Sequence, residues 1–196
     1  MIMKPLIVFM LLGILLCVTA KAQNEKQELP YSFTHKVKGK IKMIVAPFDS
    51  ITINYKPKMP HKIEGVREEP LPTRWASTND VIWDIKKMAT SEKVKGGKLW
   101  RLEVTSSKAK AISLRFHNIQ ISKDAYLFVY SVDSTEIWGP IQVRVKTKHE
   151  GMTAEDIKGE SVIVEYFEPK NVKNTAKVII TSISHHFYDV GLQNQK

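Results

Sequence analysis

Residues 125–130 have the sequence Ala125-Tyr126-Leu127-Phe128-Val129-Tyr130. Aromatic and β-branched side chains follow one another here without a charged residue, which is typical of a strand buried on both faces of a sheet. A second run, Val162-Ile163-Val164-Glu165-Tyr166-Phe167, has the same character apart from one carboxylate, and Gly159 and Pro169 bound it. We therefore expect two central strands and a fold that is built on sheets.

Strands with a period of two are expected on both sides of these runs. Polar and apolar residues alternate at residues 99–104 and 141–146, and residues 111–116 and 178–183 are further strand candidates. Turn signals separate the strands at Gly96-Gly97, Asp133-Ser134, Gly139-Pro140 and Gly151. No long stretch has the period of a helix, although residues 153–157 would allow one helical turn. The pattern predicts an all-β fold, an antiparallel β-sandwich or jelly roll.

Large aromatic side chains on the predicted strands are the expected anchors of the core. Burying such a side chain contributes on the order of 1.5–3 kcal/mol, so these residues should dominate the stability of the domain. They are Trp83, Trp100, Tyr126, Phe128, Tyr130, Trp138 and Tyr166.

The chain divides into four predicted parts. We assign residues 1–22 to a signal peptide and residues 23–80 to an N-terminal extension with one or two strands. Residues 81–190 form the predicted β-sandwich domain, and residues 191–196 form a C-terminal tail. Within the extension, residues 51–55 alternate and predict a strand. A length of 196 residues fits one domain plus such an extension.

The N-terminus has the parts of a secretory signal peptide. Lys4 is basic, residues 6–20 carry no charge, and Ala20-Lys21-Ala22 matches a small-x-small cleavage site. We expect a secreted, periplasmic or cell-envelope protein that begins near Gln23 and does not span a membrane after cleavage. A retained anchor is a weaker alternative, because a spanning helix needs ~18–20 apolar residues. A lipid anchor on Cys17 is a second alternative. It is disfavoured because the residue before a lipidated bacterial cysteine is normally small, and here it is Leu16.

Composition excludes several classes of protein. The chain is 43% hydrophobic and 26% charged, which is the balance of a folding, globular protein rather than a disordered one. Its single cysteine, Cys17, lies in the predicted signal peptide. A mature chain without it has no disulfide, no thiolate nucleophile and no cysteine ligand for zinc. The net charge of +10 permits an anionic partner.

Basic residues recur with a period of two near the start of the predicted mature chain. The alternation of Lys36, Lys38, Lys40 and Lys42 places them on one face of a predicted strand. We interpret this face as solvated, with contact to an anionic glycan or envelope surface as the alternative. Binding of nucleic acid is not expected, because no aromatic residues are interleaved with these lysines.

Candidate catalytic groups are few. His185 and His186 are adjacent, so on a strand their side chains would point to opposite faces, and we interpret the pair as structural. No serine lies in a GxSxG or GDSGG turn, no histidine spacing predicts a metal site, and there is no Gly-rich phosphate loop. We therefore predict no catalytic, cofactor-binding or metal-binding residues and no enzymatic activity.

Two groups of carboxylates are candidates for a catalytic acid–base pair. Glu68 and Glu69 adjoin Pro70 and predict a solvated loop. Glu165, with Glu168 nearby, lies in an apolar strand, where we expect its side chain to reach solvent or to meet a basic neighbour.

Six short motifs occur in a fixed order between Trp83 and Tyr188. They are Gly97-Lys98-Leu99-Trp100-Arg101-Leu102-Glu103-Val104, residues 109–116, residues 125–130, Trp138-Gly139-Pro140, residues 159–169 and Ile183-Ser184-His185-His186-Phe187-Tyr188. Together they resemble the region upstream of the catalytic domain in bacterial lysyl endopeptidase-like secreted serine proteases. The resemblance implies a non-catalytic β-sandwich pro-region. Because the sequence ends at Lys196, where the catalytic domain is expected to begin, no family catalytic residue is carried over.

Three functions remain open at this point. The first is a protein-interaction module that chaperones, inhibits or targets a secreted serine protease. The second is a cell-surface or carbohydrate-binding module, and the third is a truncated protease that lacks its catalytic domain.

Overall fold

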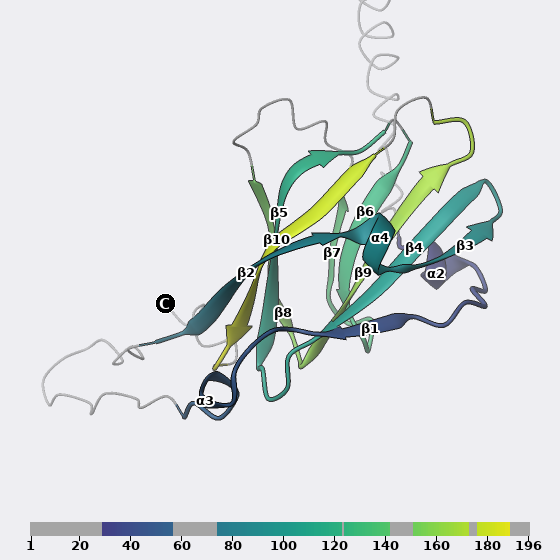
Figure 1. Cartoon of the computed structure of the whole chain (residues 1–196). Coiled ribbons are helices and arrows are strands. Elements are labelled where there is room, and N and C mark those ends of the chain that lie inside the picture. The colour runs from purple at the N-terminus through teal and green to yellow at the C-terminus, as the bar shows by residue number, and fades with distance from the viewer. Residues whose placement is uncertain (1–28, 57–73, 123, 142–150, 173–175, 189–196) are drawn as a thin grey trace, which may run out of the picture.

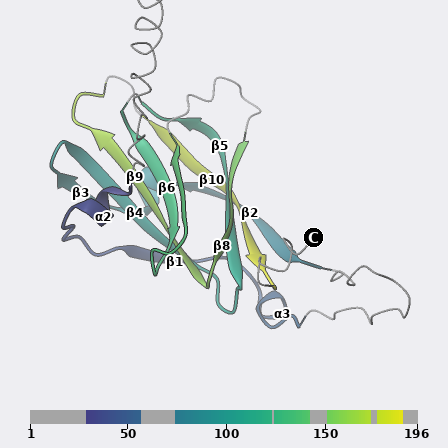
Figure 2. The ribbon, with the colours of Figure 1, turned by 180° about the vertical axis from the view of Figure 1, so that it is seen from behind.

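The computed structural model describes residues 29–56, 74–122, 124–141, 151–172 and 176–188, which form two β-sheets (Figures 1 and 2). The six-stranded sheet has the order β1-β4-β9-β6-β7, with β3 also paired to β4, and the four-stranded sheet has the order β2-β10-β5-β8. The strands of the first sheet are β1 (Lys42–Val45), β3 (Thr90–Val94), β4 (Gly97–Thr105), β6 (Tyr126–Ser131), β7 (Ile137–Ile141) and β9 (Ser161–Pro169). Those of the second are β2 (Ala76–Asp84), β5 (Ala111–Gln120), β8 (Gly151–Lys158) and β10 (Lys177–His186).

The predicted all-β sandwich is confirmed. Every strand pair is antiparallel except β1 with β4, which run parallel from Lys42 opposite Leu102 to Val45 opposite Thr105. The described helices are single turns: α2 (Tyr31–Thr34), α3 (Ser50–Ile53) and α4 (Ile85–Met88). β1 and the first half of β2 come from the predicted N-terminal extension, and both pair into the sheets.

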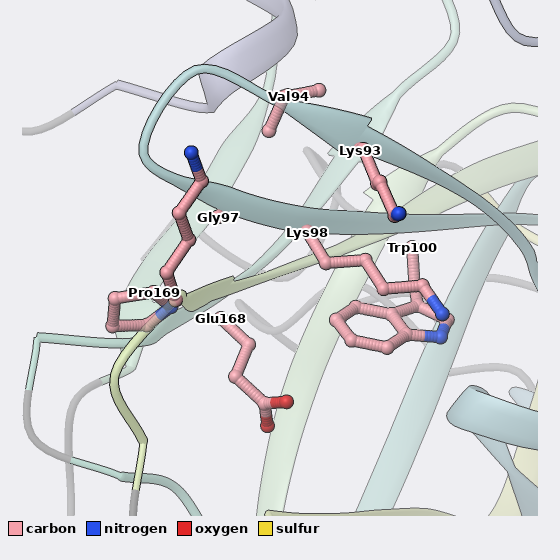
Figure 3. A pocket seen from close by; sticks show the side chains of 8 residues that line it. Lys93, Val94, Gly97, Lys98, Trp100, Glu168 and Pro169 are labelled. Carbon is pink, nitrogen blue, oxygen red and sulfur yellow. The ribbon is translucent and has the colours of Figure 1, made fainter.

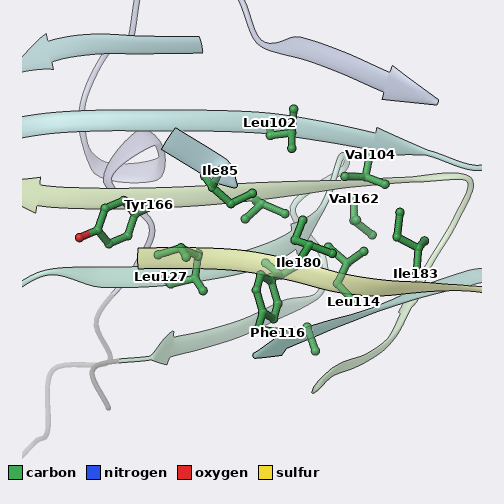
Figure 4. Close-up of a cluster of buried hydrophobic side chains, with 14 of the residues drawn as sticks. Ile85, Leu102, Val104, Leu114, Phe116, Leu127, Val162, Tyr166, Ile180 and Ile183 are labelled. Carbon is green, nitrogen blue, oxygen red and sulfur yellow. The ribbon is translucent and has the colours of Figure 1, made fainter. Parts of the chain in front are cut away.

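The core fills the space between the two sheets (Figure 4). Leu102 and Val164 extend from the six-stranded sheet toward Leu114, Phe116 and Ile180 of the four-stranded sheet. Each of these five side chains is fully buried, as close packing of two apolar sheet faces requires.

The predicted anchors separate into two groups. Trp100 and Tyr166 lie between the sheets, and Trp83 and Trp138 pack against that core while only partly buried. Tyr126, Phe128 and Tyr130 instead belong to apolar clusters on the outer face of the six-stranded sheet. These three alternate with Leu127 and Val129, which face the core, so β6 is buried on both faces as predicted.

Residues 29–41 form the cover of this outer face. Tyr31 stacks on Phe167 with ring centroids 5.5 Å apart, and Phe33 meets Tyr130 edge-on at 4.9 Å. Burial on the outer face therefore comes from an irregular N-terminal segment, and not from a helix layer as in parallel sheets.

Four local predictions are wrong. Residues 51–55 were expected to form a strand, but Ser50–Ile53 form α3, because the Asp49 carboxylate accepts a hydrogen bond from the Thr52 N–H (2.7 Å) and caps the turn. Residues 153–157 belong to β8 and not to a helical turn, because pairing with β5 satisfies their backbone. Gly139 and Pro140 lie inside β7, where the register shifts between Leu127 and Val129, so they form an irregularity in the strand rather than a turn.

The fourth concerns the lysines. Among them only Lys42 belongs to a described strand, although Lys36, Lys38, Lys40 and Lys42 are all exposed. Neighbouring Val37 and Ile41 pack against the outer-face clusters, so the alternation arises from an extended covering segment.

Some predictions lie outside the described residues. These are the signal peptide (1–22), the tail (191–196), the Glu68-Glu69 pair and the strand residues after Ile141 up to residue 146.

Candidate functional site

His185 and His186 point to opposite faces of β10, as predicted. His185 faces inward and is 1% exposed, with Nδ1 2.7 Å from Ser106 Oγ. The rings of Phe48 and Phe187 lie 5.4 and 5.0 Å from its own ring, centroid to centroid. Burial lowers the pKa of His185 below its usual value, which favours the neutral ring at pH 7. The contact ties β10 to the residue that follows β4.

His186 lies on the outer face of the four-stranded sheet in contact with a serine and an aspartate. Its Nε2 is 2.8 Å from Ser113 Oγ of β5 and 3.1 Å from Asp156 Oδ1 of β8. Ser113 Oγ donates to Asp156 Oδ1 (2.9 Å) and accepts from the Asp156 N–H (3.0 Å). Asp156 has a φ of 46°, a left-handed conformation, where the register between β5 and β8 shifts. Three strands therefore converge on one Ser–His–Asp cluster.

The hydrogen bonding of this cluster differs from that of a catalytic triad. The only hydroxyl proton of Ser113 goes to Asp156, so His186 Nε2 must supply the proton in its own contact with Ser113. In a triad the serine and the acid contact opposite nitrogens of the imidazole, which accepts the serine proton. Here both contact Nε2. This arrangement ties the three strands together through one serine, one histidine and one aspartate.

Glu165 is not on a solvent face, contrary to the prediction. It is completely buried under residues 29–41, where Oε1 accepts from the Ser32 N–H (3.2 Å) and Oε2 accepts from the Tyr130 hydroxyl (3.0 Å). Arg101 lies opposite Glu165 in the β4–β9 register, but its guanidinium donates to the Gly39 carbonyl (2.6 Å). Burial and the adjacent carboxylate raise the pKa of Tyr130 well above its usual value. The carboxylate therefore holds the covering segment in place.

Glu168 has the basic neighbour that was expected for Glu165. Lys86 Nζ of α4 lies 2.6 Å from Glu168 Oε2, and the Tyr166 hydroxyl donates to the same oxygen (2.9 Å). Burial and this carboxylate raise the pKa of Tyr166. Lys86 Nζ also lies 5.0 Å from the centre of the Trp100 ring, so its charge is shared between a carboxylate and an aromatic face.

A cavity of about 500 Å³ opens beside this ion pair, where the β3–β4 hairpin meets the end of β9 (Figure 3). Lys93, Lys98 and Lys170 contribute three exposed ammonium groups to its wall, with Trp100 and Glu168 completing the polar and aromatic lining. The one carboxylate among these lining residues, Glu168, is already paired with Lys86 of α4. The cavity therefore has a positive balance of charge.

The walls of the cavity are fixed by close backbone packing. A Cβ at Gly97 would collide with the backbone carbonyl of Glu168, so only glycine lets β4 and β9 approach this closely here. Lys98 Nζ lies 4.8 Å from the centre of the Trp100 ring and covers it, and Figure 3 shows its side chain extended along the indole. Trp100 itself is only 5% exposed.

Neither grouping was predicted from the sequence. The Ser113–Asp156–His186 cluster joins residues from three strands, and the strand order that brings them together has no local signal. Lys93, Lys98 and Lys170 lie in separate segments, although the Gly96-Gly97 turn signal did mark the hairpin that carries the first two. Long-range pairing is the information that was missing.

Within the described part of the chain, no three His, Cys, Asp or Glu side chains are grouped so that they could hold a metal ion. In that same part, no helix has the length and apolar character needed to cross a membrane.

No protein-family model matches the chain, and searches of the curated proteins and of the solved structures find no match either.

Proposed function

We propose that this chain is a secreted, non-catalytic β-sandwich module that binds another polypeptide along the free edge of β2. We propose further that its partner is a secreted trypsin-like serine protease, which it chaperones, inhibits or targets. The partner class rests on the sequence resemblance of residues 83–188, and the docking edge rests on the structure.

The observation that carries the proposal is a long edge strand with a highly exposed apolar side chain. β2 has nine residues and ends the four-stranded sheet, so the backbone groups on its outer side pair with no strand of the described residues. Ile82 on this strand is 86% exposed, at the point where the β2–β10 register shifts. Long edges with exposed apolar residues invite strand addition, and proteins usually shorten, charge or cover them. An extended partner segment that adds to such an edge is an established mode of peptide recognition.

The other edge on this flank is a weaker docking site. β1 also carries exposed apolar side chains, Met43 and Val45, but it has only four residues and begins with Lys42. A short, charged strand is a typical protected edge. Both views of the ribbon place β1 and β2 on the same flank of the sandwich (Figures 1 and 2), and the Asn79 side chain bonds the Pro47 carbonyl between them.

The side chains of β2 indicate the chemistry of the partner segment. Ile82 would pack against an apolar side chain on the added strand, and the exposed Asp80 would favour a basic residue near its own position. Cross-strand pairs of these two kinds each contribute roughly 0.2–1 kcal/mol. The partner is therefore expected to offer an extended segment with an apolar and a basic residue on the same face, two positions apart.

The binding experiment mixes the predicted mature chain with a purified lysyl endopeptidase-type protease, both native and refolding from denaturant. We expect a complex in size-exclusion chromatography, together with a changed protease activity or refolding yield. Ile82→Lys should weaken binding by about tenfold or more, because a charge would be buried against an apolar contact. The matched control is Ile51→Lys, since Ile51 is also highly exposed (79%) but lies in α3. Absence of any complex with either form of the protease would overturn the proposal.

The non-catalytic part of the proposal has its own assay. The chain alone should not turn over peptide esters, Lys- or Arg-containing amides, casein or common polysaccharides. Turnover that co-purifies with the wild-type protein and disappears in Ser113→Ala and His186→Ala would contradict it.

A further inference from the structure

We infer that the cavity beside Trp100 binds an acidic saccharide, with the carboxylate of the sugar among Lys93, Lys98 and Lys170 and the sugar ring on the indole. This site is separate from the β2 edge and does not depend on the docking of a protein partner. Its volume of about 500 Å³ lies in the range of natural small-molecule sites, roughly 300–1,000 Å³.

Charge is the first argument for an anionic ligand. Three lysines line the cavity, and no ion pair joins any of them to a carboxylate among the residues that the structure describes. The one lining carboxylate, Glu168, is neutralised by Lys86, which approaches it from α4. An anionic ligand in the cavity would therefore be surrounded by lysines without a competing acid.

The aromatic wall is the second argument, and it selects a ring-shaped ligand. The Lys98 ammonium lies over the Trp100 ring at 4.8 Å, and Lys98 is exposed. An anion in the cavity would draw this ammonium toward itself and uncover the indole face. Lys86 would stay where it is, because Glu168 holds it at 2.6 Å. The uncovered face is an apolar platform on which the C–H face of a sugar ring can pack.

The fixed backbone of the cavity is the third argument. The close contact of Gly97 with the carbonyl of Glu168 sets the distance between β4 and β9, and the β3–β4 hairpin closes one side. A site carried by paired strands keeps its shape before the ligand arrives, so little ordering opposes binding. Only the lysine side chains have to reorient.

The experiment titrates the predicted mature chain with digalacturonate and follows binding by calorimetry and by the indole N–H signals in nuclear magnetic resonance spectra. We expect saturable binding that weakens with added salt, a shifted Trp100 signal, and at least about tenfold weaker binding of the neutral digalactose. The triple variant Lys93→Gln, Lys98→Gln, Lys170→Gln should lose at least about tenfold in affinity. These side chains are exposed, so the fold should not suffer. Lys177→Gln, an exposed lysine on β10, is the matched control and should bind like the wild type.

Other outcomes would overturn this inference. They are equal binding of the neutral sugar, no saturable binding up to about 10 mM, or unchanged affinity of the triple variant. Tighter binding of adenosine monophosphate or of a short peptide with a free carboxylate would assign the cavity to a different ligand and would equally reject the saccharide.

Discussion

Glu165 is a buried carboxylate that joins β9 to the covering segment of residues 29–41. From its position in an apolar strand, we predicted that its side chain reaches solvent or meets a basic residue. In the structure the side chain is buried, and its partners are the Tyr130 hydroxyl and the Ser32 N–H. The partner Ser32 lies 133 residues away in the sequence. Such a contact has no local signature. The opposite orientation of His185 and His186 could be predicted, because it depends only on the alternation within one strand.

Replacing Glu165 should destabilise the protein. Glu165→Ala would leave the Ser32 N–H without its acceptor, at a cost of about 1–3 kcal/mol for a buried group left unsatisfied. The Tyr130 hydroxyl would lose one of its two partners and keep Ser32 Oγ at 3.0 Å. Glu165→Gln should cost less, because its amide oxygen can still accept one of these bonds. Urea denaturation measures both changes. The exposed Glu155 of β8 gives the matched control, and a loss in Glu155→Ala as large as in Glu165→Ala would contradict the assignment.

The two histidines should make stability depend on pH. Burial lowers the pKa of both below the usual value of 6.5, so at slightly acidic pH the unfolded chain binds more protons than the folded one. Their contribution to stability is therefore fully present above pH about 6.5 and is lost progressively as the pH falls below it. The free energy of unfolding should decrease from pH 7 to about 5.5, and this slope should be shallower in the double variant His185→Gln, His186→Gln. Identical slopes would show that the histidines are not responsible.

At the scale of elements, the strands were predictable where alternation and apolar runs are strong, as in β4, β6 and β9. The wrong predictions concern short segments whose conformation depends on a local hydrogen bond or on pairing with a distant strand. Asp49 caps residues 50–53 into a turn of helix, and pairing with β5 makes residues 153–157 a strand. The covering role of residues 29–41 could not be predicted, because the apolar residues of that segment are few and match no regular element.

The covering segment should contribute measurably to stability. Phe33 packs edge-on against Tyr130, and its partial burial should be worth about 1–3 kcal/mol. Phe33→Ala should therefore lower the midpoint of denaturation and increase the binding of a hydrophobic dye to the uncovered outer face. Leu29→Ala is the control, since Leu29 is 42% exposed and should change little. Equal effects of the two variants would show that residues 29–41 do not cover the sheet in solution.

At the scale of the whole molecule, the sequence predicted the two-sheet architecture but not which strands form the edges. The order β2-β10-β5-β8 leaves β2 at an edge, and the proposed docking role of Ile82 depends on that position. The same pairing of distant segments brings Lys170 to the hairpin of Lys93 and Lys98. Both proposed sites therefore depend on the long-range strand pairing, which periodicity in the sequence cannot predict.

Hydrogen–deuterium exchange, measured on the mature chain with and without the bound protease, tests the docking of a partner strand on β2 most directly. Strand addition would give the free backbone N–H groups of β2 hydrogen-bond acceptors, so exchange should slow in residues 76–84. Peptides from β8, at the opposite edge of the same sheet, should exchange as in the free protein and serve as the internal control. Slower exchange over residues 76–84 alone is the predicted result. Unchanged exchange there, with protection elsewhere in the chain, would contradict the account.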